Sequence, residues 1–385
     1  MIQNFSFHTT PQLHFGQGSL ERLPQELKQW NPHSILLVSD PGVLKAGITA
    51  KVETLIVDAG YRVTIFSEVE PDPRIETAEA CANAARSCKA DVIIGVGGGS
   101  AMDIAKVAAV LAYSKQPIHL MFGIEQVNAA GLALILVPTT AGTGSEVTHI
   151  AILSDEQEHL KKGIVSKFLF PRLAIVDPLL TLGVPAAVTA ASGMDALLHA
   201  VEAFTSKNAN DLSDTLARRA MRLISENLRD AYQNGQNLEA RTGMLEGSML
   251  AGMAFANAGV TAVHAFAYPI GAEFHIPHGV ANSIMMGPVL TFNISGNPAK
   301  FAEVAECISE KIDGTSVQDR AELSVAIMKQ LAHDIDIPKN LSSFGVRKEH
   351  IPNLADGVLK VTRLLANNPR AITRDDAIAL YTEVL

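Results

Sequence analysis

The chain has 385 residues, of which 48% are hydrophobic and 18% charged, and its formal net charge is −9 at pH 7. A chain of this length can bury one large core or two ordinary ones, and we expect two domains. It contains no cluster of Lys and Arg, which argues against nucleic acid or an anionic membrane as a partner. The three cysteines, Cys81, Cys88 and Cys307, fit no disulfide or metal-binding spacing and indicate a reducing compartment.

The N-terminal segment, residues 1–8, lacks the basic and apolar regions of a secretory signal, so we expect a cytoplasmic protein. Residues 5–15 alternate around Pro11, a pattern that predicts an edge hairpin. Residues 247–272 are uncharged over a length that could span a membrane. They include Asn257, His264 and Pro269, so they indicate a pair of buried helices instead.

Short β-rich apolar runs alternate with helical stretches up to about Pro178. The predicted strands are residues 35–38, 63–66, 92–96, 134–137 and 173–176. This βαβ order predicts an α/β domain with a mainly parallel, Rossmann-like sheet covered by helices.

From Pro185 onward, strand patterns give way to long helices rich in Ala, Leu and Met, such as residues 211–227 and 238–254. We therefore predict an α/β dinucleotide-binding domain over residues 1–182 and an all-helical metal-binding domain over residues 183–385. A cleft between the two domains would bring nucleotide and metal together.

Two glycine-rich turns follow predicted strands. In the first, Gly95 and Gly97 fit the G-x-G-x-x-G fingerprint, whereas Ser100 stands in its third glycine position. Free backbone N–H groups and the positive end of a helix dipole make such a turn a candidate diphosphate cradle. An ordinary tight turn between a strand and a helix would use the same residues. The second turn, residues 138–146, is rich in Thr and Gly, and the two turns together can flank one nucleotide.

An acidic residue, Asp40, follows the first predicted strand. A carboxylate there can accept both ribose hydroxyls of an adenosine and would repel the extra phosphate of NADP, which favours NAD. Because Asp40 directly precedes Pro41, it could equally serve as a helix N-cap or turn residue.

A metal-binding pattern lies in the predicted helical domain. Asp195 and His199 stand four residues apart, so on a helix they project from one face, one turn apart. His264 and His278 follow in a region rich in Gly, Ala and Pro that can return to this helix. One carboxylate and three imidazoles suit Fe(II) or Zn(II) better than Ca(II) or Mg(II). Any one of these histidines, taken alone, could also be a hydrogen-bonded core or surface residue.

Taken together, the motifs resemble the group III, iron-containing alcohol dehydrogenase family over almost the full length. The segments that carry the resemblance are residues 14–20, 97–103, 138–146, 162–166, 176–178, 193–196 and 276–279. The resemblance implies the dehydroquinate synthase-like fold of that family, NAD and iron (or zinc) as cofactors, and the same four metal ligands. It also implies that a set of residues contacts or supports the cofactor. These are Asp40, Gly97, Gly98, Gly99, Ser100, Asp103, Thr139, Thr140, Thr143, Ser145 and Lys161.

One position departs from the family pattern. Many members carry a further histidine four residues after the third ligand, where this chain has Tyr268. A tyrosine can donate or relay a proton but is a poor base at neutral pH, and it could also merely pack beneath the cofactor. His275 is an alternative proton donor, since histidine is the side chain that titrates near neutral pH. Tyr268 and His275 are therefore the candidate catalytic residues.

The expected activity is NAD-dependent interconversion of a small primary alcohol, or a diol, with its aldehyde. A divalent ion lowers the pKa of a hydroxyl group and polarises a carbonyl group, and hydride moves to or from C4 of the nicotinamide. Four protein ligands are unusual for catalytic zinc, which favours iron. The alternatives are a maleylacetate reductase-like or other keto- or hydroxy-acid reductase of the superfamily, a dehydroquinate synthase-type cyclase, and a non-catalytic NAD- or metal-binding subunit. The family also implies a homo-oligomer, a dimer or larger.

Overall fold

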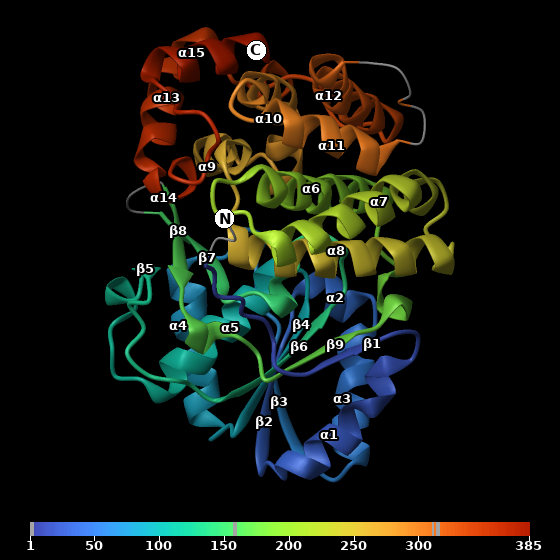
Figure 1. Cartoon of the computed structure of the whole chain (residues 1–385). Coiled ribbons are helices and arrows are strands. Elements are labelled where there is room, and N and C mark those ends of the chain that lie inside the picture. Colours follow the sequence, from blue (N-terminus) through green and yellow to red (C-terminus); the bar gives the residue numbers. More distant parts are fainter. Residues whose placement is uncertain (1–3, 157–159, 310–311, 313–315) are drawn as a thin grey trace. The chain divides into compact units, whose positions relative to one another are not determined.

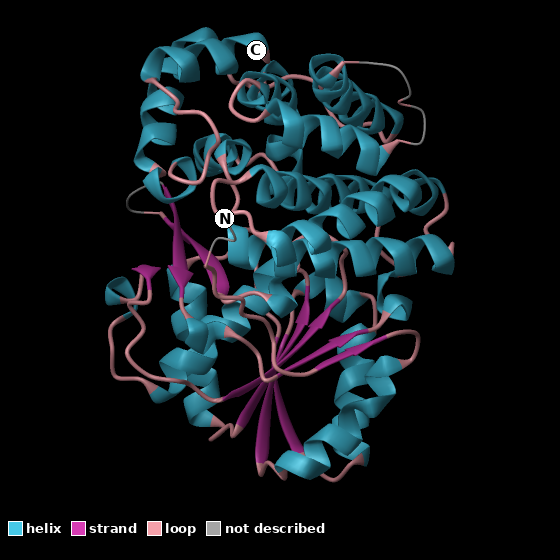
Figure 2. Cartoon of the chain, viewed as in Figure 1, coloured by secondary structure: helices cyan, strands magenta, loops and turns pink. Residues whose placement is uncertain are grey.

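The computed structural model of the chain describes residues 4–156, 160–309, 312 and 316–385. Its elements divide into two compact units, which we describe separately. The sheet unit comprises residues 9–140 and 144–184, and the helical unit comprises residues 4–8, 141–143 and the described residues from 185 to 385 (Figures 1 and 2).

The sheet unit is built on a six-stranded sheet in which every pair of neighbouring strands is parallel. The strand order is β1-β9-β6-β4-β2-β3. All five strands predicted from the sequence are confirmed. The six strands are β1 (Leu13–Phe15), β2 (Ser34–Val38), β3 (Arg62–Phe66), β4 (Val92–Gly97), β6 (Ala133–Pro138) and β9 (Leu173–Val176).

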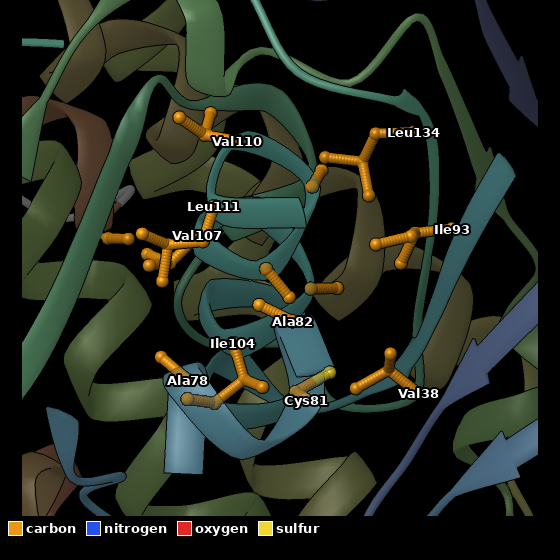
Figure 3. Close-up of a cluster of buried hydrophobic side chains, with 14 of the residues drawn as sticks. Val38, Ala78, Cys81, Ala82, Ile93, Ile104, Val107, Val110, Leu111 and Leu134 are labelled. Atoms are coloured by element: carbon orange, nitrogen blue, oxygen red, sulfur yellow. The ribbon is translucent and has the colours of Figure 1, made fainter. Parts of the chain in front are cut away.

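Helices cover both faces of this sheet, so its central strands are almost entirely apolar and buried. In β2, Ile35 and Leu37 belong to the cluster on one face, while Leu36 and Val38 belong to the cluster on the other. Figure 3 shows the second cluster, packed between the sheet and two helices. The helices of this unit are α1 (Leu23–Trp30), α2 (Pro41–Lys45), α3 (Ile48–Asp58), α4 (Ile75–Ser87) and α5 (Gly99–Tyr113).

A second, three-stranded sheet of order β5-β8-β7 was not predicted. Its central strand carries Lys161, Lys162 and Gly163, which hide the apolar alternation that marks a strand. The strands are β5 (Gly123–Ile124), β7 (Ile150–Asp155) and β8 (Leu160–Val165).

The hairpin predicted over residues 5–15 is wrong. Only β1 forms there, and it pairs in parallel with β9 at the edge of the large sheet, with Leu13 opposite Ala174. Pro11 has no N–H to donate to a hairpin ladder, whereas the carbonyl group of Gln12 accepts a hydrogen bond from the N–H of Ala174 at 3.0 Å.

The helices of the helical unit all follow Pro185, and the unit contains no strand in its described residues. Two of its helices, α7 and α8, approach each other closely because a glycine of α8 faces α7. A Cβ atom on Gly247 of α8 would lie 2.6 Å from Cγ1 of Ile224 on α7. The helices are α6 (Ala186–Thr205), α7 (Asp211–Gln233), α8 (Leu238–Ala258), α9 (Ala262–Phe274), α10 (His278–Ile294), α11 (Pro298–Ile308), α12 (Val317–Asp334), α13 (Ile351–Lys360), α14 (Thr362–Leu365) and α15 (Arg374–Glu383).

Within the described residues, no single helix is both long and apolar enough to cross a membrane. The pair α8 and α9 passes the same test of length and composition only when taken together, and the two helices are bent by 102° at the break between them. This pair contains most of the uncharged segment noted in the sequence, and most of its side chains are buried.

Candidate metal centre and nucleotide-binding turns

Helix α6 presents three ionisable side chains on one face. Asp195, His199 and Glu202 are four and three residues apart, a spacing that returns to the same side of a helix at each turn. Their exposed fractions are only 3%, 6% and 0%. Charged groups are seldom buried to this degree unless a partner or a metal offsets their desolvation. This face of α6 is therefore suited to ionic partners.

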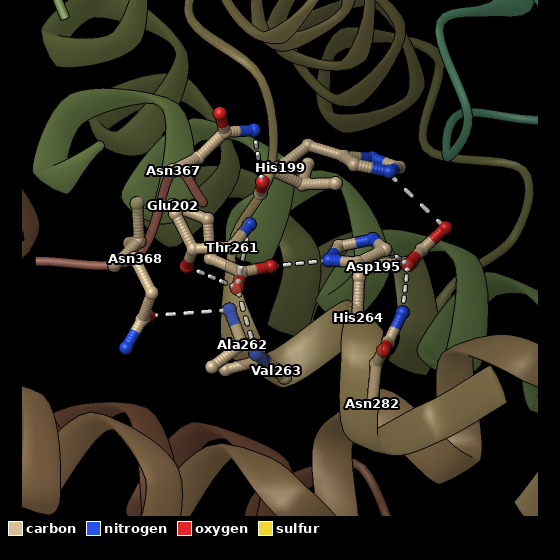
Figure 4. A network of polar contacts seen from close by, with 12 residues as sticks. Asp195, His199, Glu202, Thr261, Ala262, Val263, His264, Asn282, Asn367 and Asn368 are labelled. Carbon is tan, nitrogen blue, oxygen red and sulfur yellow. Dashed lines mark hydrogen bonds and ion pairs between the residues drawn. The ribbon is translucent and has the colours of Figure 1, made fainter. Parts of the chain in front are cut away.

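Two other helices bring imidazoles to this face. His264 lies in the first turn of α9, and His278 is the first residue of α10. Nε2 of His264 is 3.5 Å from Oδ1 of Asp195, and Nε2 of His278 is 3.8 Å from the same oxygen. Candidate ligand atoms of Asp195, His199 and His264 all lie within 4.8 Å of one another (Figure 4). The structure thus brings together the four residues predicted as metal ligands.

The second ring nitrogen of two of these imidazoles faces an acceptor. Nδ1 of His199 is 3.2 Å from the carbonyl oxygen of Gly142, and Nδ1 of His264 contacts a carboxylate oxygen of Glu202. Because these oxygens accept hydrogen bonds, each Nδ1 carries a hydrogen, and Nε2 is the ring nitrogen left to bind a metal ion. Nε2 of His264 is buried and has no hydrogen-bond partner among the described residues.

Glu202 also completes the start of helix α9. Its Oε1 accepts hydrogen bonds from the N–H groups of Thr261 at 3.1 Å and Val263 at 2.8 Å, and from the Thr261 hydroxyl at 2.5 Å. The N–H group of Ala262 donates to Oδ1 of Asn368 at 3.3 Å (Figure 4). The first N–H groups of a helix have no partner within it, so outside acceptors must satisfy them. Glu202 therefore caps α9 with one oxygen and faces an imidazole with the other.

Burial and neighbouring charges set the protonation of this cluster in opposite directions. Burial would raise the pKa of Asp195, but the surrounding imidazoles outweigh it and hold that pKa well below its usual range. Burial lowers the pKa of His199 to about 4. Burial also opposes protonation of His264, yet Glu202 and Asp195 together raise its pKa to about 9. At neutral pH the cluster without a metal holds a proton on His264, which a metal ion would replace.

The donor set fits a divalent transition metal. Ligand atoms that are each about 2.1 Å from an ion lie roughly 3–3.5 Å apart, close to the separations found around Oδ1 of Asp195. The buried, unpartnered Nε2 of His264 is the kind of atom that an ion would satisfy. Asn282 donates to Oδ1 of Asp195 at 2.7 Å and so orients that carboxylate. Asp195 and Glu202 supply two negative charges, which match the charge of a divalent ion.

The two candidate catalytic residues occupy different surroundings. Tyr268 is buried on α9, one turn beyond His264, and its ring centre lies 6.0 Å from that of His278. His275 is exposed and ends α9 in the left-handed region, with φ of 53°. The structure therefore places Tyr268 beside the ligand cluster and His275 on the short connection between α9 and α10.

In the sheet unit, several predicted nucleotide-binding residues gather at the carboxyl ends of β2, β4 and β6. Oδ1 of Asp40 caps α2, accepting hydrogen bonds from the N–H groups of Gly42 at 2.8 Å and Val43 at 2.9 Å. Its Oδ2 faces Gly97, where an added Cβ atom would lie only 3.0 Å away. The N–H group of Thr139 donates to the carbonyl group of Gly97 at 2.9 Å. Asp40 is thus an N-cap, and its second oxygen faces the glycine turn.

The N-terminus of helix α5 lies at this turn. The helix begins at Gly99 and Ser100, and its N-cap residue Gly98 provides no side-chain hydrogen bond to the first turn. A Cβ atom on Gly98 would lie 3.4 Å from Oγ1 of Thr140 in the second turn. The first N–H groups of this 15-residue helix and the positive end of its dipole favour an anion there.

Asp103 and Ser145 form part of a buried polar network. The Ser145 hydroxyl donates to Oδ1 of Asp103 at 2.6 Å, and the N–H group of Ile152 donates to Oδ2 at 2.9 Å. The fully buried Lys106 donates to the hydroxyls of Ser145 at 2.7 Å and Thr148 at 3.0 Å. Burial raises the pKa of Asp103 and lowers that of Lys106 to about 8. This network ties the second turn to helix α5.

Lys161 and Thr143 are the remaining two predicted cofactor residues. The ammonium group of Lys161 on β8 binds Oδ1 of Asp72 at 2.5 Å, not a glycine turn. Thr143 lies in the short segment 141–143, which belongs to the helical unit.

Sequence reasoning missed Glu202, Lys106 and Asn282. Glu202 was detectable, since it stands seven residues after Asp195 and therefore on the same helix face. Lys106 also had a signal, because it is the one basic residue of α5 and stands directly before a long apolar run. Asn282 gave none, because its contact with Asp195 joins residues 87 positions apart.

Two family models cover nearly the whole chain. The model described as "Iron-containing alcohol dehydrogenase" matches residues 10–178, and the model described as "Fe-containing alcohol dehydrogenase family, C-terminal" matches residues 189–385. The chain belongs to the iron-containing alcohol dehydrogenase family.

Relatives of this iron-containing alcohol dehydrogenase match from end to end. It is 41% identical to a long-chain-alcohol dehydrogenase of Geobacillus thermodenitrificans, covering 96% of this chain and 94% of the relative. It is 39% identical to a sulfoacetaldehyde reductase of Bilophila wadsworthia, covering 98% of each chain. The chain is therefore an alcohol oxidoreductase, as predicted.

Solved structures confirm the fold class. A 1,3-propanediol oxidoreductase superposes with a TM-score of 0.96 at 38% identity, with all of both chains covered. A sulfoacetaldehyde reductase from Bifidobacterium kashiwanohense, solved in complex with NAD+, gives a TM-score of 0.88 at 29% identity, with 99% of both chains covered. Iron in the family's name and NAD+ in this relative agree with the two predicted cofactors.

Proposed function

We propose that this protein is an NAD(H)-dependent oxidoreductase that interconverts a small primary alcohol or diol with its aldehyde. In this proposal, Asp195, His199, His264 and His278 hold the divalent metal. The convergence of these four side chains from α6, α9 and α10 is the observation that carries the proposal.

Oxidation of an alcohol removes a hydride from carbon and a proton from oxygen. A bound divalent ion lowers the pKa of the alcohol hydroxyl and, in the reverse direction, polarises the aldehyde carbonyl. The residues of α6, α9 and α10 would hold that ion, and the glycine-rich turns would hold the cofactor that carries the hydride.

The sheet unit supports NAD as the hydride carrier. The N-terminus of α5 and the two glycine-rich turns suit a diphosphate. Oδ2 of Asp40 faces the same turn and would accept the ribose hydroxyls, while its charge would oppose the phosphate of NADP. Asp103 and Ser145 act in this proposal by bracing the second turn.

Iron is the metal we propose, with zinc as the alternative. Imidazole and carboxylate ligands accept either ion, but a site with four protein ligands must expand its coordination to admit a substrate oxygen, which iron does more readily. The proton that leaves the alcohol needs a route to solvent, and Tyr268 and His275 are the groups that we propose for it.

Steady-state oxidation of NADH and of NADPH with a panel of substrates tests this function. The panel contains propanal, a long-chain aldehyde, sulfoacetaldehyde and maleylacetate, each assayed with and without a chelator and after addition of Fe(II) or Zn(II). We expect NADH-dependent reduction of an aldehyde that is lost on chelation and restored by the metal. Reduction of maleylacetate that survives chelation would favour the metal-independent reductase. Absence of turnover in a metal- and NAD-loaded protein would favour a binding subunit.

A homo-oligomer completes the proposal. Strand β1 is an edge strand of the large sheet, so its outer side presents unpaired backbone groups that a second copy could pair with. Size-exclusion chromatography with light scattering measures the mass directly, and a monomer would refute this part.

A further inference from the structure

Of the three buried ionisable residues on one face of α6, Asp195 and His199 are predicted metal ligands and Glu202 is not. It is completely buried, and one oxygen contacts Nδ1 of His264. We propose that Glu202 is a positioning residue of the metal centre, which keeps the hydrogen of His264 on Nδ1 and thereby directs the lone pair of Nε2 to the metal. This inference rests on the metal site of the proposed function.

The carboxylate of Glu202 is held in one orientation. Three donors converge on its Oε1, namely the N–H groups of Thr261 and Val263 and the Thr261 hydroxyl, at 3.1, 2.8 and 2.5 Å. Oε2 is left to the imidazole of His264. Because Thr261 is the N-cap of α9 and Val263 lies in its first turn, the same carboxylate fixes both the helix that carries the imidazole and the imidazole itself (Figure 4).

The charge of Glu202 adds to this geometric effect. An anionic partner on Nδ1 makes the imidazole a stronger electron donor at Nε2 than a neutral acceptor would. The centre then contains two carboxylates, Asp195 and Glu202, so that a divalent ion leaves it with no net charge when the imidazoles are neutral. Removal of either charge would leave a buried positive charge, which is costly.

Glu202→Gln should change the contact with His264 while it keeps the hydrogen bonds that cap α9. The amide has the same shape, and the three donors at Oε1 require its carbonyl oxygen, since an NH2 group there would face three other donors. The NH2 group must therefore point at His264 and donate to Nδ1. His264 is then driven to carry its hydrogen on Nε2, the atom that should bind the metal. The substitution thus reverses one hydrogen bond and preserves the others.

The test is the affinity of the metal-free full-length protein for Zn(II), measured by chelator competition in the same buffer for all variants. We expect Glu202→Gln to bind Zn(II) about 10- to 100-fold more weakly than the wild type, the usual effect of losing a carboxylate partner of a metal-binding imidazole. Circular dichroism and the melting temperature of the metal-free form should stay close to the wild type. An unchanged affinity in Glu202→Gln would overturn the proposal.

Two control variants distinguish positioning from general support. Thr261→Val removes one donor to Oε1 but keeps the carboxylate and its contact with His264. Glu146→Gln removes a different buried carboxylate, in the sheet unit. Both should bind Zn(II) with nearly wild-type affinity. If Thr261→Val weakens binding as much as Glu202→Gln, Glu202 acts only by supporting α9 and the proposal fails.

Zn(II) binding by the wild type distinguishes an error in the role of Glu202 from an error in the proposed metal centre. A wild-type protein that binds no metal refutes the proposed metal centre itself, before any variant is compared. If Glu202→Gln does not fold, nitrogen-15 spectra of the Zn(II)-loaded wild type decide the question. We expect the hydrogen of His264 on Nδ1 and the metal on Nε2, and the opposite arrangement would overturn the proposal.

Discussion

The carbonyl oxygen of Gly142 lies 3.2 Å from Nδ1 of His199. Gly142 belongs to the second glycine-rich turn, whereas His199 is a proposed metal ligand on α6. The turn therefore has a second role beside any contact with the nucleotide, because its backbone fixes which nitrogen of His199 keeps a lone pair.

Replacement of Gly142 tests this relationship. A Cβ atom there would lie 2.7 Å from Cβ of Ser192, so Gly142→Ala must displace the turn together with its carbonyl oxygen. We expect a several-fold loss of Zn(II) affinity and a loss of stability of about 1–3 kcal/mol, as for other overpacked positions. Gly183→Ala is the matched control, since a Cβ atom on Gly183 meets nothing within 4 Å. A destabilised Gly142→Ala protein with wild-type Zn(II) affinity would show that the carbonyl does not orient His199.

The preference for NAD over NADP is expected to depend on the charge of Asp40. Oδ1 of Asp40 caps α2, so the test substitution must keep this oxygen. Asp40→Asn keeps an oxygen for the N–H groups of Gly42 and Val43 and removes the charge. We expect the ratio of kcat/KM for NADH over NADPH to fall on the order of tenfold, the size of one screened charge interaction. A wild-type protein that uses NADPH better than NADH would refute the role of Asp40.

Proton transfer is tested by single and double variants of Tyr268 and His275. Tyr268→Phe removes only a hydroxyl from a buried ring. For His275 the left-handed backbone, with φ of 53°, makes Ala a strained choice, so His275→Asn is preferred because Asn tolerates this conformation. If either residue relays the proton, turnover near neutral pH falls and the pH–rate profile changes, while NAD affinity and metal content stay constant. Unchanged profiles in both single variants and in the double variant would leave solvent and the cofactor ribose as the route.

The buried carboxyl group of Glu146 should make stability depend on pH. Glu146 is 1% exposed, its Oε1 has no partner among the described residues, and burial raises its pKa from 4.5 to about 7. The folded state therefore binds the proton more tightly than the unfolded chain, so stability is highest below pH 4.5 for this group and falls as the pH rises to about 7.

Glu146→Gln should remove this dependence. As the pH rises through that range, the free energy of unfolding of the wild type should fall relative to that of the variant by up to about 3 kcal/mol. Melting temperatures of both proteins across the range provide the measurement. A difference between wild type and variant that does not change with pH would contradict the burial of an ionisable Glu146.

The sequence contained enough information for the large sheet and for the pair Asp195 and His199, because both depend on short-range patterns. Strands such as β2 and β4 are apolar runs bounded by turns, and Asp195 and His199 are one helical turn apart. The small sheet was hidden because polar residues such as Lys161 stand in the middle of β8. The pattern along a single strand also could not show that β1 pairs in parallel with β9, because residues such as Leu13 and Ala174 are far apart in the sequence.

Side-chain partners were the least predictable part of the site. The pairing of Lys161 with Asp72 joins residues 89 positions apart, and that of Glu202 with His264 joins residues 62 positions apart. Such contacts depend on how helices and strands pack, which the local sequence pattern does not encode. Asp40 shows the same limit, because ribose binding and N-capping were alternatives in the sequence. In the structure the N-cap uses only Oδ1 and leaves Oδ2 facing Gly97.

The central claim is that Asp195, His199, His264 and His278 hold the metal on which alcohol oxidation depends. The most direct measurement is metal content per chain together with NADH-dependent aldehyde reduction in the wild type and in His264→Ala, each reconstituted with Fe(II) under anaerobic conditions. The wild type is expected to contain about one metal ion per chain and to be active, and His264→Ala is expected to lose metal and activity together. A metal-free protein that retains full activity would contradict the account.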